Sequence, residues 1–462
     1  MGSAKRIIIE HGTAITMNSN NDVIDDSRIV IEDDRIVSIG ACSEPVGNAL
    51  PAEELEHAKT LNARGKLIIP GLINAHTHNI YYLMRGLGME FELLGWLKKA
   101  MWPCLSEMNA EEAYIGALLG YAENIKNGNT SVMDNFYMSR RNKANADSIA
   151  EAACKSGLRV GLVRGCHDVQ GMIPLEFIEP PEEAAEEYER LIATWHGKND
   201  GKISVWLSPV NLLYSSEKAI ETLKSLMDKH LVGLHTHVAE AKREVEMIEE
   251  RFGMGYIEVL DRFGIVGSKF HAAHAVWLSD REIDILAERG ATVIHNPASN
   301  MLLASGIAPV SKMIARGVNV ALGTDSPNNS QDMIESMKLA MLLQRVGLLD
   351  PQAMSPSTVL KMATRAGAQA LGLEGSLGSI EPGKLADIVI INSDVIHNLP
   401  VYDHVTNLVL SGKCSDVETV IIGGEVVMEN RVLKTIDEAG LIKEVKRVAR
   451  DLSARALSRL GG

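Results

Sequence analysis

Two short stretches, far apart in the chain, each contain a His-Thr-His triplet. NAHTHN occupies residues 74–79, and LHTHVAE occupies residues 234–240, with a glutamate three residues after its second histidine. Imidazole nitrogens are common ligands of zinc and similar divalent metals. A carboxylate beside such a metal can carry protons during a reaction. The two triplets therefore predict a centre that binds a metal ion and activates water.

Five residues are candidates for this centre. Side chains alternate between the two faces of a strand, so His76 and His78 point the same way and can hold one metal ion. His237 can add a third nitrogen, and Asp325, at the end of LGTD, can add a carboxylate oxygen. This set suits Zn²⁺ or Fe²⁺, with one position left for water. His274, at the end of AAH, is the fifth candidate, although a lone histidine at such a place is more often a hydrogen-bonded structural residue.

The elements that must position these residues alternate between short apolar β-like runs and amphipathic helical segments. Eight runs occur: KLIIPGLINAH, TSVMDN, RVGLVRG, ISVWLSPV, VGLHTHV, FHAAHAV, TVIHNP and VNVALGTD. One connecting segment, SDREIDILAERG, predicts a helix with a serine cap, a capping box and a terminal glycine. Eight such units predict a (β/α)₈ barrel, with a doubly wound open sheet as the alternative. The candidate residues follow runs one, five, six and eight, and reactive residues of a barrel gather at such strand ends.

The two ends of the chain are rich in β-like runs. Residues 5–66 alternate such runs with polar turns, and ADIVIINSD and VETVIIGGEVVMENRVL repeat this pattern near the other end. We therefore expect the two ends to pair in one small sheet domain. Residues 437–460 have helical periodicity and many charges.

The composition excludes several classes of partner. The formal charge is −14 with no basic stripe, which argues against nucleic acid or an anionic membrane. No apolar run approaches the roughly 20 residues that span a bilayer, and the first residues lack the apolar segment of a signal peptide. The five cysteines are scattered and form no C-x-x-C pair, so we expect a cytoplasmic protein without a disulfide framework.

Several motifs together resemble the amidohydrolase superfamily: PGLINAHTH, LHTHVAE, AAHAV, HNPASN, GIAPV and LGTD. The most similar branch is the cytosine-deaminase-like group, which includes triazine hydrolases and the deaminases of methylthioadenosine and S-adenosylhomocysteine. The resemblance covers nearly the whole chain. It implies a TIM barrel over residues 67–374 and a small β-sandwich domain formed by residues 1–66 and 375–462, with GSIEPGKLADIVIIN as the return to the sandwich. It also implies a homo-oligomer.

Carried onto this chain, the resemblance gives each candidate a role. The implied metal ligands are His76, His78, His237 and Asp325, and the implied catalytic residues are Glu240, His274 and Asp325. Relatives with two metal ions use a carbamylated lysine at the end of strand four. Here ISVWLSPV contains no lysine and Lys202 precedes it, so we expect one divalent metal per chain, Zn²⁺ before Fe²⁺. His235 lies deeper in its strand, and a structural or supporting role is expected for it.

The expected reaction is hydrolysis at a nitrogen heteroaromatic ring. Metal-activated water displaces an amino, alkylamino or similar leaving group, as in the triazine hydrolases. Asp325 accepts a proton from the water, His274 orients it, and Glu240 protonates a ring nitrogen. A methylthioadenosine or S-adenosylhomocysteine type of nucleoside deaminase is the alternative. Two departures weaken it: Leu105 stands where that branch has a ribose-binding glutamate, and Val210 where it has a histidine after the proline.

Two other functions remain open: cyclic amide hydrolysis, which the missing lysine disfavours, and a barrel that binds a ligand without turnover. The substrate is expected to be a small planar heterocycle held in an apolar slot. The segment after the first run is rich in aromatic residues and methionine, although such residues more often form a core. The candidate substrate contacts are Tyr81, Met84, Glu90, Trp96, Trp102, Asn211, Asn300 and Ser326.

Overall fold

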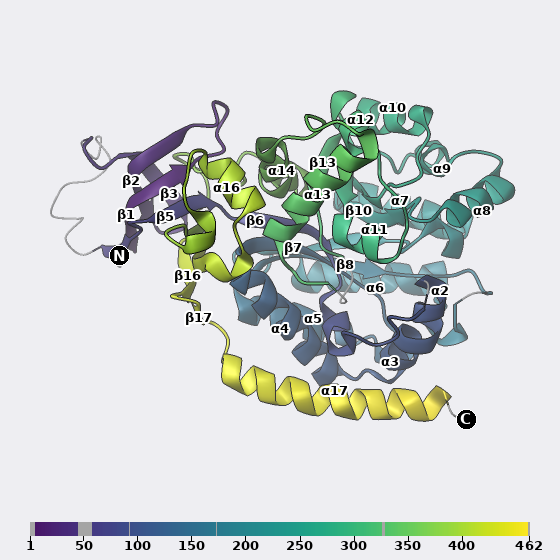
Figure 1. Cartoon of the computed structure of the whole chain (residues 1–462). Coiled ribbons are helices and arrows are strands. Elements are labelled where there is room, and N and C mark those ends of the chain that lie inside the picture. The colour runs from purple at the N-terminus through teal and green to yellow at the C-terminus, as the bar shows by residue number, and fades with distance from the viewer. Residues whose placement is uncertain (1–4, 45–57, 92, 172, 326–328, 461–462) are drawn as a thin grey trace.

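The computed structural model describes residues 5–44, 58–91, 93–171, 173–325 and 329–460. Two parts can be distinguished in Figure 1. A barrel surrounded by helices holds the middle of the chain, and a sheet at its side holds strands from both ends of the chain. The C-terminal helix α17 (Glu438–Leu460) runs along the outside of the barrel against α3 (Trp102–Glu107) and α4 (Ala110–Lys126).

Eight parallel strands form the barrel. They are β6 (Leu72–Thr77), β7 (Asn129–Phe136), β8 (Arg159–Gly165), β9 (Ile203–Ser208), β10 (Leu234–Val238), β11 (Phe270–His274), β12 (Thr292–His295) and β13 (Asn319–Leu322). Each strand pairs with the next in chain order, and a parallel bridge between Thr77 and Asp325 joins the first strand to the end of the last. Most residues of these strands are buried, as expected for strands covered on both faces. The predicted (β/α)₈ barrel is confirmed.

Helices surround the barrel, and their ends follow local capping rules. The principal connecting helices are α4, α5 (Asn145–Ser156), α6 (Pro181–Trp195), α7 (Glu217–His230), α8 (Lys242–Phe252), α9 (Tyr256–Arg262), α10 (Asp280–Arg289), α11 (Pro297–Leu302), α12 (Val310–Ala315), α13 (Met333–Leu348), α14 (Pro356–Ala363) and α15 (Arg365–Ala370). Helix α10 has the predicted ends, because Ser279 and Glu282 form a capping box and Gly290 terminates it with a φ of 68°. After β6 the chain forms η2 (Asn79–Met84), α2 (Leu93–Trp96) and η3 (Leu97–Met101), which lead into α3.

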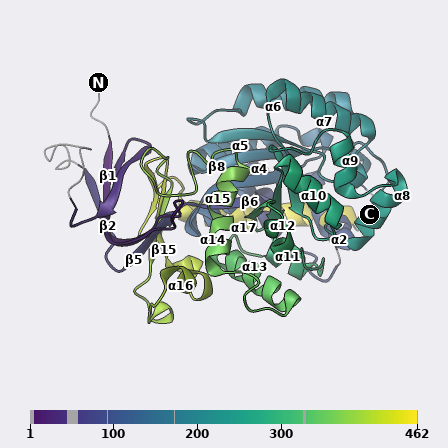
Figure 2. The ribbon, with the colours of Figure 1, turned by 90° about the horizontal axis from the view of Figure 1, so that it is seen from above.

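The two chain ends pair in one mixed sheet of nine strands, as expected. Its strands are β1 (Arg6–Ile15), β2 (Val23–Glu32), β3 (Arg35–Ala41), β4 (Lys59–Asn62), β5 (Lys66–Pro70), β14 (Ile388–Asn392), β15 (Val417–Ile422), β16 (Glu425–Glu429) and β17 (Val432–Leu433). The antiparallel pair of β5 with β14 joins the two ends. Figure 2 shows this sheet beside the barrel.

Alternation along β14 explains how the sheet attaches. Ile388 and Ile390 belong to the core of the terminal sheet, whereas Val389 and Ile391 belong to the main hydrophobic core, which contains the barrel. Because successive side chains of a strand face opposite sides, one strand supplies both cores. The expected sandwich is therefore a single hydrogen-bonded sheet with one face on its own core and the other on the main core.

The structure divides the first of the eight predicted runs between the two sheets. Residues 66–70 form β5 in the terminal sheet, and the barrel strand begins only at Leu72. Gly71 is the residue between the two strands. Glycine is required there, because a Cβ atom would lie 2.1 Å from Oγ1 of Thr130 on β7. The expected domain boundaries at residues 66/67 and 374/375 stay a prediction. Within the described residues, no helix is long and apolar enough to cross a membrane.

Candidate active site

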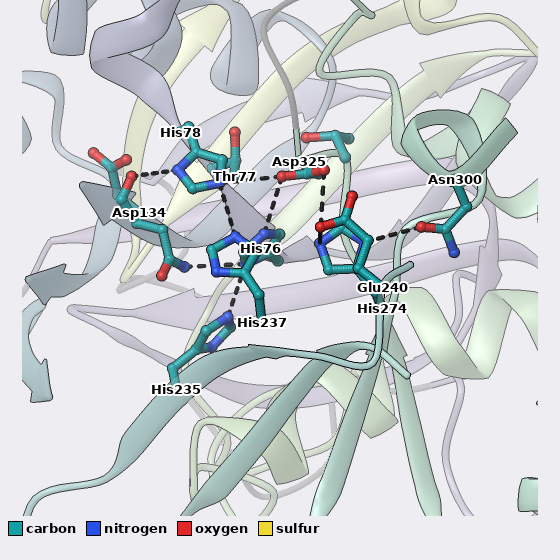
Figure 3. Close-up of polar contacts among 12 residues, drawn as sticks. His76, Thr77, His78, Asp134, His235, His237, Glu240, His274, Asn300 and Asp325 are labelled. Atoms are coloured by element: carbon teal, nitrogen blue, oxygen red, sulfur yellow. Dashed lines mark hydrogen bonds and ion pairs between the residues drawn. The ribbon is translucent and has the colours of Figure 1, made fainter. Parts of the chain in front are cut away.

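The polar residues predicted from the sequence converge at one end of the barrel (Figure 3). His76 and His78 come from the end of β6, His237 from β10, His274 from the end of β11, and Asp325 follows β13. Nε2 of His76 and Nε2 of His78 each lie 3.1 Å from Oδ1 of Asp325. Nε2 of His237 lies 3.4 Å from Nε2 of His78. The structure thus brings all four predicted metal ligands together.

The backbone turns sharply where these side chains leave the strands. Val210, Ala239, His274, Ala275 and Asp325 all have φ between 47° and 71°, the left-handed region that non-glycine residues seldom adopt. Each lies just beyond a barrel strand or at its last residue. Such strain tends to gather at functional sites, where the surrounding structure holds it in place.

The donor atoms of two histidines are oriented by backbone carbonyls. Nδ1 of His78 lies 2.8 Å from the carbonyl oxygen of Asn135, and Nδ1 of His237 lies 2.7 Å from that of Val210. A carbonyl only accepts, so each Nδ1 carries the proton and each Nε2 presents a lone pair. These lone pairs face each other with no proton between them, and a carboxylate lies beside them. Such a set fits a divalent cation, and zinc prefers these donors.

Burial and neighbouring charges set the protonation states of the candidate ligands. Burial lowers the pKa of His76 to about 4, so the ring is neutral at physiological pH. Burial disfavours the charged form of Asp325, but His274 and the neighbouring His76 and His78 hold the pKa of this carboxyl well below its usual range. Asp325 therefore stays a carboxylate. Neutral imidazoles and a carboxylate are the forms that bind metal.

Glu240 and His274 lie beside the ligand atoms. Nδ1 of His274 donates to Oδ1 of Asn300 at 2.9 Å. Burial disfavours the charged ring, but Glu240 and Asp325 raise the pKa of His274, which favours the form that also carries a proton on Nε2. This Nε2 has no hydrogen-bond partner among the described residues and lies 3.8 Å from Oε2 of Glu240 and 3.8 Å from Oδ2 of Asp325. Burial raises the pKa of Glu240 to about 7, so this carboxyl can hold and release a proton near neutral pH.

A pocket opens above this centre, and four of the predicted substrate contacts line it. These are Tyr81, Trp96, Trp102 and Asn211. The amide of Asn211 is already engaged, because it donates to Glu244 and accepts from the backbone N–H of Leu213.

The other predicted contacts lie elsewhere. Met84 is buried in the main core, and Glu90 is exposed on the segment after η2; neither is among the described residues that line the pocket. Asn300 is buried and binds His274 instead of facing the pocket. Ser326 lies outside the described residues. Met84 is therefore a core residue of a helical segment, and Glu90 is a solvated surface residue.

The structure adds pocket residues that were not among the substrate contacts predicted from the sequence. They are Leu97, Tyr137, His167, Ile173, Val210, Tyr214 and Leu303. His167 is the most informative of them. It stands two residues after β8, so the rule that functional residues follow barrel strands could have found it. Burial and the nearby Arg164 lower its pKa to about 3, so it lines the pocket as a neutral imidazole, with the ring of Tyr137 edge-on at 4.8 Å.

Comparison with known proteins defines the family. The family model described as "Amidohydrolase family" matches residues 67–427, so the chain belongs to the amidohydrolase family. The chain is 38% identical to a 5'-deoxyadenosine deaminase of Methanosarcina acetivorans over 97% of this chain and 99% of the relative. It is 36% identical to a 5-methylthioadenosine/S-adenosylhomocysteine deaminase of Syntrophomonas wolfei, over 97% and 99%.

Solved structures agree with this placement. A zinc-bound adenosine deaminase from Xanthomonas campestris superposes with a TM-score of 0.89 at 28% identity, covering 98% of both chains. A triazine hydrolase from Arthrobacter aurescens superposes with a TM-score of 0.88 at 25% identity, covering 96% of this chain and 99% of the other. The protein is therefore a metal-dependent hydrolase of the deaminase type, acting on carbon–nitrogen bonds other than peptide bonds, as the motifs predicted.

Proposed function

We propose that this enzyme deaminates an adenosine-type nucleoside whose 5' end is small and uncharged, such as 5'-deoxyadenosine or 5'-methylthioadenosine. The observation that carries the proposal is the composition of the pocket wall. Aromatic and aliphatic side chains form most of it, and no lysine or arginine is among the described residues that line it. An apolar slot suits a flat purine ring. Without a cationic partner, a 5' phosphate or a free carboxylate would be poorly held.

The names of the relatives support the same substrate class. The two sequence relatives described above are called deaminases of 5'-deoxyadenosine and of methylthioadenosine or S-adenosylhomocysteine. This favours the nucleoside alternative over the triazine type that the sequence motifs placed first. Two observations keep a triazine as the second candidate substrate: Leu105 is buried where a ribose-binding glutamate was expected, and Val210 lines the pocket where a histidine was expected.

We assign His76, His78, His237 and Asp325 as ligands of one Zn²⁺ per chain, a donor set that would also accept Fe²⁺. When bound, the metal would supply an activated water molecule for attack on the ring. Metal analysis of the purified protein tests both identity and number. His237→Ala should lose the metal, whereas Glu240→Gln should retain it. Equal retention in both variants would contradict the assignment.

The chain's own residues then move protons. Glu240 can hold a proton near neutral pH, and it donates this proton to the ring nitrogen beside the reacting carbon, which makes that carbon more electrophilic. Asp325 accepts one proton of the attacking water through its carboxylate and passes it to the amino group, which leaves as ammonia. The remaining proton of the new hydroxyl returns to the carboxylate of Glu240, so both acids are restored. Nε2 of His274, which lies 3.8 Å from both carboxylates, forms a hydrogen bond with the attacking water and orients it. Asn300 holds the His274 ring in place by accepting a hydrogen bond from its Nδ1.

Ammonia release across a substrate panel tests the function. The panel contains 5'-deoxyadenosine, 5'-methylthioadenosine, S-adenosylhomocysteine, AMP and an amino-triazine. We expect the highest kcat/KM for the first two and the lowest for AMP. Preference for the amino-triazine would establish the second candidate instead, and preference for AMP would refute the argument from the pocket wall. A zinc-loaded protein that releases neither ammonia nor amine from any of them would be a binding protein.

We also propose a cytoplasmic homo-oligomer. The five cysteines, which are free in the structure, suit a reducing compartment. Light scattering of the purified protein measures the assembly, and a monomer at micromolar concentration would contradict this proposal. Fractionation of the source cells tests the compartment.

A further inference from the structure

Three buried histidines form a row that leads away from the metal centre. Nδ1 of His76 lies 2.7 Å from Nε2 of His235, and Nδ1 of His235 lies 3.1 Å from Nδ1 of His271. Nε2 of His271 then lies 2.7 Å from the carbonyl oxygen of Ala370, the last residue of α15. All three imidazoles belong to residues with no exposed surface. Figure 3 shows the contact between His76 and His235.

The carbonyl at the end of the row determines where each proton lies. Burial lowers the pKa of His271 to about 4, so its ring is neutral and carries one proton. The carbonyl of Ala370 can only accept, so that proton lies on Nε2 and Nδ1 of His271 is bare. His235 must then donate from Nδ1, which leaves its own Nε2 as an acceptor. His76 therefore donates from Nδ1. Its Nε2 and Oδ1 of Asp325, 3.1 Å apart, then both present lone pairs, as two ligands of one cation do.

The opposite arrangement fails at the far end of the row. If His76 carried its proton on Nε2, each donor and acceptor in the row would be reversed. Nε2 of His271 and the carbonyl of Ala370 would then be two acceptors 2.7 Å apart in a buried site. The side-chain amide of Asn135 also lies 3.0 Å from Nδ1 of His76. With the proton on that nitrogen the amide presents its oxygen there, because hydrogen-bond partners decide which end of an amide faces them.

His76 differs in this respect from the other two histidines of the centre. His78 and His237 each donate from Nδ1 directly to a backbone carbonyl, which fixes the metal-binding tautomer in one step. His76 donates to His235, so its tautomer depends on two further side chains. Trp206 stacks on His271 at 4.5 Å and restrains the orientation of the last ring.

We propose that His235 and His271 are positioning residues that hold His76 in the tautomer that binds the metal. The carbonyl of Ala370 fixes the tautomer of His271, which fixes that of His235, which fixes that of His76. This inference rests on the metal site of the proposed function and not on its substrate. It also separates the two His-Thr-His triplets: both histidines of the first are ligands, whereas the second supplies one ligand and one positioning residue.

Zinc affinity measured by competition with a chelator tests the inference. The comparison includes the parent, His235→Leu, His271→Leu and His235→Gln, each loaded with zinc. We expect the two leucine variants to bind zinc roughly 10–100-fold more weakly, the usual effect of losing a partner of a metal ligand. His235→Gln should retain most of the affinity, because an amide can accept from His76 and donate to His271.

His295→Leu is the matched control. His295 is another fully buried histidine at the end of a barrel strand, and it is not part of the row. Affinity losses in the row variants no larger than in this control would overturn the proposal, as would a glutamine variant as weak as the leucine variant. Zinc binding requires no substrate, so a wrong substrate assignment would leave these results unchanged.

A second measurement needs no mutation. Nitrogen-15 NMR of the zinc-loaded parent, with labelled histidines, reports which ring nitrogen carries a proton. The expected pattern is a proton on Nε2 of His271 and on Nδ1 of His235. The reverse pattern in either ring would overturn the proposal even if every leucine variant failed to fold.

Discussion

Replacement of Glu240 by glutamine removes one proton carrier and keeps the volume of the side chain. Glu240 lies two residues beyond β10, lines the pocket and is 6% exposed. Its Oε2 lies 3.8 Å from Nε2 of His274, so it belongs to the group of atoms that would surround the reacting carbon. Because it is not a proposed ligand, Glu240→Gln should keep the metal and lose turnover.

The expected size of the loss follows from the role. A positioned acid or base contributes 10²–10⁴-fold to a rate, or about 2.7–5.4 kcal/mol of activation free energy. The contribution is largest when the pKa of the group lies near the working pH, and burial raises the pKa of Glu240 to about 7. We therefore expect kcat to fall at least about 10³-fold, from the middle of this range upward, with KM changed much less.

The pH dependence provides an independent check. Glu240 must be protonated to donate, so kcat/KM should fall as the pH rises through its pKa. A bound divalent cation lowers that pKa, because it favours the carboxylate. The alkaline limb should therefore lie at or below about pH 7, and it should disappear in Glu240→Gln. A parent activity that stays constant from pH 6 to 9, about two units above the raised value, would contradict the acid role.

Glu244→Gln is the matched control for this experiment. Glu244 is also a buried glutamate, four residues further along, but it does not line the pocket. Its carboxylate accepts from the backbone N–H of Glu240 at 3.0 Å, so it supports the turn and not the chemistry. Ammonia release and zinc content are measured for both variants. A kcat for Glu240→Gln within about tenfold of the parent, below the range for positioned proton transfer, or an equal loss in both variants would refute the reasoning.

Three further perturbations test other parts of the site. A Cβ atom at Gly323 would lie 2.8 Å from the carbonyl oxygen of His76 and would displace this proposed ligand. Gly323→Ala should therefore weaken zinc binding while the circular dichroism spectrum stays unchanged; a normal zinc affinity would show that the backbone of His76 need not be held so closely. Glu179 and the buried Arg164 form an ion pair at 2.5 Å, so Glu179→Ala leaves a buried guanidinium without this partner. The free energy of unfolding in urea should fall by about 3–5 kcal/mol, and a decrease below about 1 kcal/mol would show that the ion pair is not essential for stability. A neutral imidazole in the pocket wall can hydrogen-bond a sugar hydroxyl, so His167→Leu should raise KM for 5'-deoxyadenosine more than for its 2',3'-dideoxy analogue. Equal changes in the two KM values would show that His167 does not bind the sugar.

The barrel could be predicted because its signals are local. Apolar runs end in polar residues, helices begin and end at caps, and each unit repeats this order. That the candidate metal ligands lie close together (Figure 3) could be predicted for the same reason, since each stands at the end of a run. The division of the first run at Gly71 could not be predicted, because nothing in the run KLIIPGLINAH shows that its two halves have different partners: β5 pairs with β1 and β14, and β6 pairs with β7.

The pocket wall was harder to predict because it comes from several loops. The aromatic segment after β6 supplies Trp96 and Trp102, but Tyr137, His167 and Tyr214 follow three other strands. Loops after different strands meet only when the barrel closes, so no stretch of sequence contains the wall. Asn300 was wrongly expected in the pocket. Its side chain accepts a hydrogen bond from His274, a catalytic candidate, and it does not line the pocket.

Val210 shows why side-chain identity alone gives an incomplete account of the site. A histidine was expected there, and its absence first counted against a nucleoside substrate. The structure places Val210 in the left-handed region with a φ of 58°, which is costly for a β-branched residue. Its carbonyl accepts from the backbone N–H and Nδ1 of His237 and from the hydroxyl of Thr236. The backbone of Val210 therefore orients His237, a proposed metal ligand, whatever side chain stands at position 210. The side chain is then free to shape the pocket.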